Sequence, residues 1–552
     1  MIFSFPRLKS SFQKICYHIL LGLNISSLLL GVLYLIFYDR FCPVFIHLHG
    51  ILLIIVFMGN IIMAYIEKAN PFLGYGYLIF SGAFMVGLPI INTILSILPT
   101  YRKTQSPISI AMTFSLLILA GILARDCMKK RRKLVEDRSV IRITNLREIK
   151  KSLWLPLLLS GFLFAGLFLV FILIRERSNG ILEAFVSEYA LFYAFFFLSL
   201  GFLFLKILKK GKHIILRHTI SIMSLGFFFI GMLPFLTSPF YINQAKKNFF
   251  EAFGEEIIME NKQKKFRKVA FSIPDYFYGI PSGEYELIEN VLFYQGQEGV
   301  DQGLKLSFDL YQPVGKETTS DFPVLIRIHG GGWTIGDKGA FNFAQMNKYF
   351  AQNYVVFDIQ YGLNDKDKFM EHIPVEETRR GAYTIDDMVR HVGIFTKYLA
   401  KHAKEYKADL NHVFISGGSA GGQLALAAGL SIHNGSYHEL FAPEITIKGL
   451  IPFYPANGLS EYIGIGGLAE FVDPIHLVDQ NSPPCIIYQG THDTIVDPLI
   501  AKRFYNAYRK QGNQACALLT MPYAGHGSDL YFSGYYNQVF LYYMERFMEI
   551  YD

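Results

Sequence analysis

The stretch Ile415-Ser416-Gly417-Gly418-Ser419-Ala420-Gly421-Gly422 decides the fold of the second half of the chain. A β-rich run at 412–415 leads into it, and a small-residue, helix-compatible run at 423–428 leads out. Between them, Gly417-x-Ser419-x-Gly421 fits a nucleophile elbow, a sharp strand-to-helix turn that holds a serine hydroxyl clear of a sheet. Glycines suit this turn because its strained backbone leaves almost no room for neighbouring side chains. The same letters also fit a glycine-rich turn with an incidental serine, so the rest of the chain has to decide.

A second glycine run follows another strand-like stretch. His329-Gly330-Gly331-Gly332-Trp333 comes directly after the apolar run 324–328. Consecutive glycines let backbone N–H groups point at a developing oxyanion, and each such donor is worth about 3–4 kcal/mol. The N–H of Ala420, next to Ser419, would complete such an oxyanion hole. A phosphate-cradling loop is the alternative, but the run lacks a Gly-Lys-Ser/Thr ending and an acidic ribose partner.

A histidine with the properties of a base follows a late strand-like run. Residues 518–521 lead into His526, which lies between two glycines. A serine hydroxyl needs a histidine to take its proton, and the histidine needs a carboxylate to hold its tautomer. The chain order Ser419, Asp493, His526 is the α/β-hydrolase order and differs from the chymotrypsin and subtilisin orders.

Two aspartates compete for the role of the acid. Asp493 and Asp497 both follow the strand-like run 484–488. Asp493 is favoured because it lies nearer the strand end, whereas Asp497 precedes Pro498, as a helix cap does. His492 is assigned to shaping this loop and not to the base.

Taken together, the motifs of the second half resemble the hormone-sensitive-lipase-like and related carboxylesterase branch of the α/β-hydrolase family, over about residues 270–552. The stretches that carry the resemblance are His329–Trp333, Gly417–Gly422, Asp493 and His526. The resemblance implies hydrolysis of carboxylic esters through an acyl-serine intermediate, without a metal or organic cofactor. It assigns further oxyanion donors to Gly331 and Gly332. Asp358-Ile359-Gln360-Tyr361 resembles the family's strand-end D-x-x-Y pattern, for which a structural role is expected.

The first half consists of long apolar runs. They lie at about residues 16–38, 43–66, 73–98, 107–124, 153–174, 187–208 and 214–236. Each is long enough to span a bilayer, and an overall composition with 52% hydrophobic and 16% aromatic residues fits a chain that lies partly in lipid. We expect seven spans, the first one retained because no small-residue cleavage site follows it.

Lysine and arginine gather in alternate loops. They are frequent in the amino-terminal tail, in 125–152 and in 206–212, and sparse in the intervening loops. The positive-inside rule then places the amino terminus inside and everything after residue 240 on the outer face. The basic loop faces anionic lipid, so the net charge of +7 does not indicate a nucleic-acid partner. Glu183 and Glu188 fall near the outer end of the sixth span, at the expected interface.

These patterns predict three segments: a multi-span transmembrane region at 1–240, a charged juxtamembrane linker at 241–270 and an α/β-hydrolase domain at 271–552. In the last segment, short β-branched or aromatic runs alternate with helical ones, which predicts a mostly parallel sheet covered by helices on both faces. Segment 454–480 lies where such folds carry a cap over the substrate pocket. The five cysteines have no metal-ligand spacing.

We therefore expect a cell-membrane protein that hydrolyses a small-molecule or lipid-like ester, with membrane lipids as its surroundings. Three other functions use the same residues. An acyltransferase would pass the acyl group to another acceptor, a receptor or scaffold would carry an inactive hydrolase domain, and an oligopeptidase-type serine peptidase would cleave peptides. The HGGGW stretch at 329–333 argues for esters over peptides. The sequence does not indicate an oligomeric state.

Overall fold

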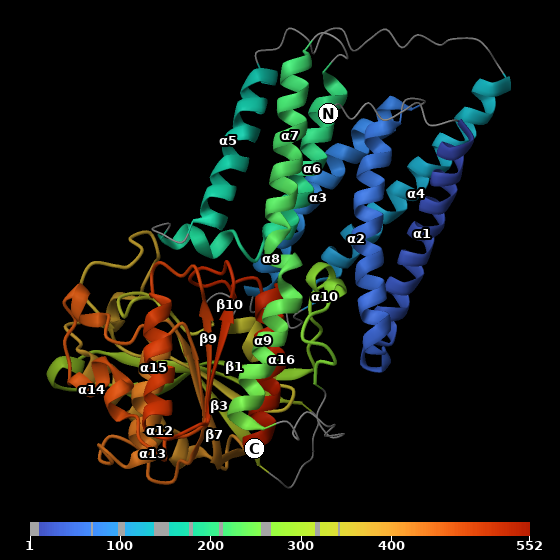
Figure 1. Cartoon of the computed structure of the whole chain (residues 1–552). Coiled ribbons are helices and arrows are strands. Elements are labelled where there is room, and N and C mark those ends of the chain that lie inside the picture. Colours follow the sequence, from blue (N-terminus) through green and yellow to red (C-terminus); the bar gives the residue numbers. More distant parts are fainter. Residues whose placement is uncertain are drawn as a thin grey trace.

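The first half of the chain is a bundle of apolar helices (Figure 1). The computed structural model describes residues 10–67, 70–97, 105–136, 154–175, 180–208, 213–254, 266–314, 321–339 and 343–552. The helices of the bundle are α1 (Ser10–Ile36), α2 (Pro43–Ile66), α3 (Pro71–Ile97), α4 (Pro107–Glu136), α5 (Trp154–Ile174), α6 (Ala190–Ile207), α7 (Ile214–Gly231) and the short α8 (Leu233–Leu236). Within these ranges, seven helices are long and apolar enough to cross a membrane, which is the number that the sequence predicts.

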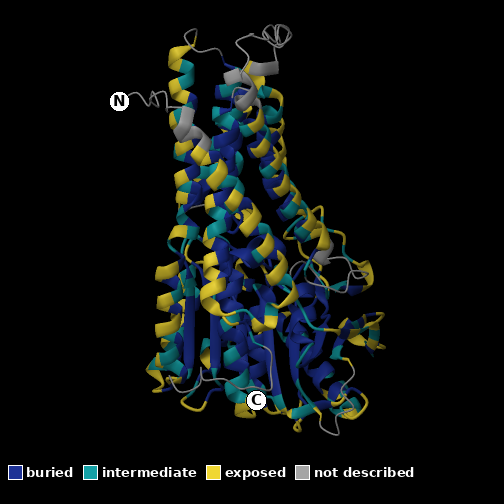
Figure 2. Ribbon diagram, turned by 90° about the vertical axis from the view of Figure 1, so that its right-hand side faces the viewer, coloured by how far each residue is buried: buried dark blue, intermediate teal, exposed yellow. Residues whose placement is uncertain are grey.

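The outer faces of these helices are apolar. Most of the exposed large hydrophobic side chains of the described residues belong to α1–α7. Figure 2 marks exposed residues in yellow along the helices of the bundle. Such faces suit lipid, where a helix also satisfies its own backbone hydrogen bonds. Much of the basic loop and most of the basic turn on which the orientation depends, residues 137–153 and 209–212, lie outside the described residues. The outer-face location of the second half therefore stays a prediction.

The second half is built on an eight-stranded sheet in the order β1-β2-β4-β3-β7-β8-β9-β10. The strands are β1 (Tyr285–Gln295), β2 (Lys305–Pro313), β3 (Phe322–Ile328), β4 (Val355–Ile359), β7 (Ala408–Gly418), β8 (Ile447–Phe453), β9 (Cys485–Gly490) and β10 (Cys516–Met521), with a separate short pair β5 (Leu363–Asn364) and β6 (Arg380–Gly381). β1 and β2 are antiparallel to their neighbours, and the strands from β4 to β10 are parallel. This arrangement confirms the predicted α/β-hydrolase fold.

Alternate residues of each strand enter two different cores. In β3, Val324 and Ile326 face a core that contains side chains of α12 (Ile385–His402), α13 (Ala420–Asn434) and α15 (Pro498–Lys510). Leu325 faces the opposite core, formed with α9 (Ser238–Phe253), α11 (Phe343–Phe350) and α16 (Tyr535–Tyr551). The period-two alternation of a strand produces this division, and both faces of the sheet are helix-covered, as predicted.

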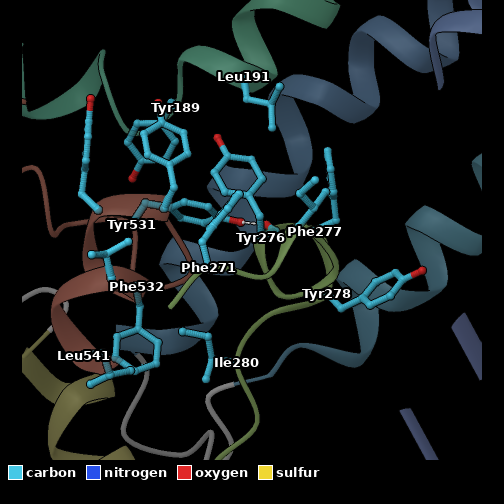
Figure 3. Packing of buried hydrophobic residues seen from close by; sticks show 14 of the residues in the cluster. Tyr189, Leu191, Phe271, Tyr276, Phe277, Tyr278, Ile280, Tyr531, Phe532 and Leu541 are labelled. Atoms are coloured by element: carbon cyan, nitrogen blue, oxygen red, sulfur yellow. Dashed lines mark hydrogen bonds between the residues drawn. The ribbon is translucent and has the colours of Figure 1, made fainter. Parts of the chain in front are cut away.

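The second of these cores continues into the membrane bundle. The short helix α10 (Ile273–Tyr278) lies between the two halves, and its aromatic side chains are fully buried (Figure 3). The Phe277 ring lies 5.1 Å from that of Phe57 in α2. The Tyr276 ring lies 4.7 Å from Phe192 in α6 and 5.6 Å from Tyr535 in α16. A single hydrophobic core therefore joins the bundle to the sheet.

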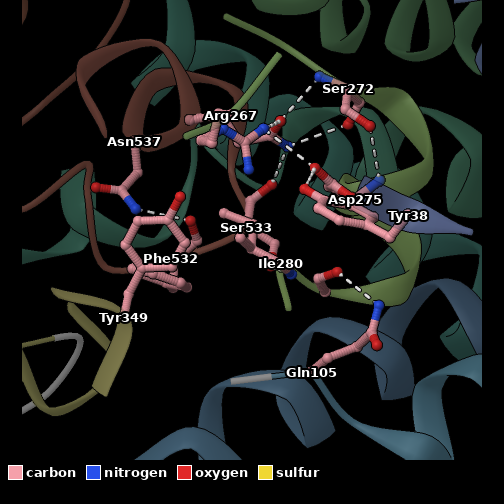
Figure 4. A network of polar contacts seen from close by, with 12 residues as sticks. Tyr38, Gln105, Arg267, Ser272, Asp275, Ile280, Tyr349, Phe532, Ser533 and Asn537 are labelled. Atoms are coloured by element: carbon pink, nitrogen blue, oxygen red, sulfur yellow. Dashed lines mark hydrogen bonds and ion pairs between the residues drawn. The ribbon is translucent and has the colours of Figure 1, made fainter. Parts of the chain in front are cut away.

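A buried polar network reinforces the same junction (Figure 4). Arg267 and Asp275 form an ion pair at 3.1 Å, with side chains only 2% and 1% exposed. Asp275 also accepts hydrogen bonds from Tyr34 and Tyr38 at the end of the first span, at 2.6 and 3.2 Å. Arg267 donates to Gln538 of α16 at 2.6 Å. The network thus connects three parts of the chain that lie far apart in the sequence.

The segment 241–270, predicted as a linker, contains most of α9 and leads into α10. Helix α9 packs against β10 and α16, and residues 255–265 lie outside the described part of the chain. The boundaries of the three predicted segments remain predictions.

Asp275→Asn should destabilise the protein strongly, because the substitution leaves the Arg267 charge buried without its counter-charge. Breaking a buried pair in this way costs about 3–5 kcal/mol. The measurement is the apparent melting temperature of the detergent-solubilised protein by circular dichroism. Glu251→Gln removes a carboxylate from the exposed pair Lys247–Glu251, whose side chains are 67% and 52% exposed, and should change the melting temperature little. Equal melting temperatures for the two variants would contradict a stabilising role of the network.

Candidate active site

Ser419 stands at the turn between β7 and α13. Its backbone has φ 56° and ψ −120°, the strained conformation expected at a nucleophile elbow. A Cβ at Gly421 would lie 2.2 Å from the carbonyl oxygen of Ile328 and 2.4 Å from that of His329, so only glycine fits there. The Ser419 N–H donates to the carbonyl of Phe453 at 2.9 Å and fixes the turn against β8.

The structure brings the predicted base and acid to this serine. His526 follows β10, and its Nε2 lies 3.1 Å from Ser419 Oγ. Its Nδ1 lies 2.9 Å from Asp493 Oδ2. With Nδ1–H donating to Asp493, Nε2 is left to accept the serine proton, which is the tautomer that general-base catalysis needs. His492 contacts Thr491 Oγ1 through its Nδ1 at 2.9 Å, in keeping with a role in the loop.

The two candidate aspartates differ in their contacts. Asp493 is 4% exposed, and its Oδ1 accepts from the Val496 N–H at 2.8 Å while Oδ2 accepts from Gln489 Nε2 at 3.1 Å. These bonds orient the carboxylate toward His526. Asp497 instead caps α15 by accepting from the Leu499 N–H at 2.9 Å.

The charges around His526 favour its protonated form. Burial by itself lowers the pKa of His526, but Asp493, and to a smaller degree Glu183 and Asp529, raise it by more, so the pKa lies above its ordinary value. The Tyr454 ring packs on the imidazole with centroids 4.5 Å apart. An imidazolium at this position would therefore be well stabilised.

The glycine run after β3 passes directly beside the serine. A Cβ at Gly330 would lie 3.3 Å from Ser419 Cβ. Gly331 and Gly332 have φ values of 120° and 58°. Within the described residues, no group accepts a hydrogen bond from their N–H groups. Ala420 is the first residue of α13, and the first N–H groups of a helix have no intrahelical acceptor. Within the described residues, the N–H groups of Gly331, Gly332 and Ala420 thus have no acceptor, and Ala420 adjoins Ser419.

The residues of the D-x-x-Y pattern hold this glycine run in place. The Tyr361 hydroxyl donates to the carbonyl of His329 at 3.1 Å, and the two rings stack at 4.4 Å. Asp358 accepts from the Gly339 N–H at 2.6 Å and from Asn347 Nδ2 at 2.8 Å. Burial lowers the pKa of His329 to about 4, so this histidine is neutral near pH 7 and acts as a structural group.

One residue at the site was not predicted. Glu183 lies in η3 (Gly180–Phe185), between α5 and α6 of the bundle, and is 4% exposed. Its carboxylate accepts hydrogen bonds from the backbone of both late loops, at His526 and at Thr494. In the sequence, Glu183 is one of the few acidic residues, with Glu188, near the outer end of the predicted sixth span. The one available signal was the pair of glycines around His526, which leaves space for another part of the chain.

Comparisons with known proteins point to esterases. Residues 308–508 match the BD-FAE family model. Esterase LipQ of Mycobacterium tuberculosis (strain ATCC 25618 / H37Rv) is 24% identical over 253 residues, which is 40% of this chain and 56% of LipQ. Esterase LipC of the same strain is 23% identical over 236 residues, which is 38% of this chain and 54% of LipC. The chain thus spans about half the length of these curated relatives.

Among solved structures, Thermogutta terrifontis esterase 2 phosphorylated by paraoxon is similar with 25% identity and a TM-score of 0.34, covering 44% of this chain and 84% of that one. A TM-score this low does not support a fold assignment, so the assignment depends on the strand order of the sheet. The strand order and the family match support an α/β-hydrolase fold for the second half of the chain. The two curated relatives are esterases, so the chain is similar to esterases in particular.

Asp493→Asn should lower kcat for a short p-nitrophenyl ester by about 10⁴-fold, because an amide at this position favours the wrong tautomer of His526. Steady-state kinetics of the purified full chain would measure the loss. Asp497→Asn is the matched control, four residues further along the same loop, and should leave kcat within a few-fold of wild type. The reverse order of effects would assign the acid to Asp497.

Proposed function

We propose that the protein is a membrane-anchored serine hydrolase that cleaves carboxylic esters through an acyl-serine intermediate. The contact that carries this proposal is the 3.1 Å approach of His526 Nε2 to Ser419 Oγ, with Asp493 behind the imidazole at 2.9 Å. The esterase relatives and the BD-FAE family model support the same chemistry.

In the proposed mechanism, Ser419 attacks the ester carbonyl while His526 takes its proton. Asp493 keeps Nε2 unprotonated before the attack and balances the imidazolium afterwards. The N–H groups of Gly331, Gly332 and Ala420 hold the oxyanion of the tetrahedral intermediate. His526 then gives its proton to the leaving alcohol. In the second half-reaction it takes a proton from the water that attacks the acyl-serine and gives that proton to Ser419 Oγ as the carboxylic acid leaves.

The site faces the bundle, which bears on the substrate. The loops after β9 and β10 contact η3, and Tyr523 packs with a small apolar cluster from α5 and the start of α6. Beside these loops, Ile181, Leu182 and Phe185 are 37%, 49% and 46% exposed. An apolar rim at the bundle end of the site favours an ester with an apolar acyl or alcohol part, a lipid-like substrate, on the outer membrane surface.

Ser419→Ala should lower kcat by about 10⁶-fold, because the alanine side chain has no hydroxyl to form the acyl-enzyme. Membranes that contain the wild type or the variant would be treated with a fluorophosphonate serine probe and assayed with a short p-nitrophenyl ester. Labelling and turnover should both disappear. A folded wild type that is neither labelled nor active would overturn the proposal and favour a receptor or scaffold.

The kcat/KM of the wild type should fall as the pH is lowered through the pKa of His526, because only the neutral imidazole accepts the serine proton. Asp493, Glu183 and Asp529 raise this pKa above its ordinary value of 6.5, so the midpoint of the acid limb should lie above pH 6.5. The measurement is a kcat/KM profile against pH with an uncharged ester. A midpoint at or below 6.5 would contradict the electrostatic environment described for His526.

A further inference from the structure

We propose that Glu183, supplied by the membrane bundle, is a positioning residue of the esterase site that ties the loop of the base to the loop of the acid. The inference rests on the proposed function, since it concerns the geometry of the same triad. It makes the bundle part of the catalytic architecture as well as an anchor.

The contacts of Glu183 reach both late loops at once. Its Oε1 accepts from the backbone N–H of His526 at 2.8 Å and from that of Thr494 at 2.9 Å. Its Oε2 accepts from the Thr494 hydroxyl at 2.6 Å. Thr494 is the residue directly after Asp493. A single carboxylate therefore holds the backbone of the base itself and the backbone next to the acid.

The base loop has space for the Glu183 side chain only because residue 525 is a glycine. A Cβ at Gly525 would lie 2.5 Å from Glu183 Cβ and 2.6 Å from its Cγ. A Cβ at Gly527 would lie 3.4 Å from Ala184 Cβ. The bundle segment thus packs directly on the two residues that flank His526, and no other residue type at 525 would permit this approach.

The segment that carries Glu183 is itself fixed by the core shared between the two halves. The Tyr276 hydroxyl of α10 donates to the carbonyl of Glu188 at 2.8 Å. The Tyr535 hydroxyl of α16 donates to the carbonyl of Ser187. Val186 packs in the apolar cluster that includes Tyr523. The segment that carries Glu183 is therefore packed against the core that the two halves share.

Glu183 also contributes charge. The groups that face His526 are Asp493 after β9, Asp529 after β10, Glu183 from η3, Tyr454 after β8 and Ser419 before α13. Of the carboxylates, Asp493 has the largest effect on the His526 pKa, and Glu183 adds to it. The hydrogen bonds that Glu183 accepts and the charge that it carries can therefore be separated by mutation.

Glu183→Ala removes the acceptor and leaves two backbone N–H groups at the loops without a partner. The His526 imidazole and the Asp493 carboxylate should then lose their alignment with Ser419. We expect kcat for a short soluble p-nitrophenyl ester to fall by about 10²-fold, the effect of misplacing a catalytic group by about 1 Å. KM should change little, because Glu183 does not contact the substrate in this scheme.

Glu183→Gln separates geometry from charge. The amide oxygen can still accept from both N–H groups, and the amide nitrogen can donate to the Thr494 hydroxyl. We expect kcat to return to within a few-fold of wild type. Because loss of the negative charge lowers the pKa of His526, the acid limb of the kcat/KM profile should move to lower pH.

Glu188→Gln is the matched control. Glu188 lies five residues further along the same segment, is fully buried, and its carboxylate accepts from the Ser187 hydroxyl at 3.1 Å. Its substitution makes the same chemical change at a carboxylate whose hydrogen bond goes to Ser187 and not to His526 or Thr494. We expect both kcat and the acid limb to stay at their wild-type values.

All variants would be made in the full chain, purified in detergent and compared by circular dichroism before kinetics. A folded Glu183→Ala with wild-type kcat would overturn the inference, and so would a Glu183→Gln whose kcat is lost with an unmoved acid limb. If Glu183→Ala does not fold, the inference is tested by the kcat of Glu183→Gln and by the acid limb of its kcat/KM profile. Loss of the proposed function itself would look different, since the wild type would then show neither probe labelling nor a Ser419-dependent turnover.

Discussion

The burial of α10 between the bundle and the sheet is the constraint on which the rest of the structure depends. Tyr276, Phe277 and Tyr278 are completely buried, and their neighbours come from both halves of the chain. Large aromatic side chains contribute much of the apolar area that a core buries, so the two halves gain stability from the same residues. A tethered soluble domain would have a core of its own and a free orientation. Here the shared core fixes the orientation and brings the α5–α6 connection to the ends of β9 and β10.

A buried arginine places positive charge beneath the site. Arg327 of β3 lies beneath the elbow, donates to Ser416 Oγ at 2.6 Å and stacks 4.3 Å from the centre of the Phe343 ring. Burial lowers its pKa to about 10, although Asp358 and Asp529 act against this. The guanidinium therefore stays charged and offsets part of the negative charge that the carboxylates place around the triad. In a site of low dielectric, these fixed charges act on one another far more strongly than they would in water.

Local patterns in the sequence predicted the fold class, and they also pointed to three residues, Ser419, Asp493 and His526, that the structure brings together. The elbow, the glycine run and the loop of His526 each end a strand whose alternation is visible in a few residues, and parallel strands bring such ends together. Strand β1 was not predicted because it is an edge strand with a mixed burial pattern, broken by Asn290 at φ 60° and by register shifts against β2. The role of Glu183 could not be predicted either. Its contact with His526 joins residues 343 positions apart, and such a contact has no periodicity or motif.

The number of spans becomes easier to understand when the bundle is treated as a support for the site. Anchoring an enzyme to a membrane requires one helix, and a single helix leaves its connecting loop free to move. To hold a carboxylate in a defined position, the segment after α5 has to be fixed by its surroundings. Its backbone accepts hydrogen bonds from α10 and α16. The segment then continues into α6, whose first turn is buried among its neighbours. Helix α6 in turn packs against α2, α3 and α7, so the position of one side chain depends on most of the bundle. On this argument, an α/β-hydrolase domain separated from its bundle would keep the three triad residues but lose the residue that aligns two of them.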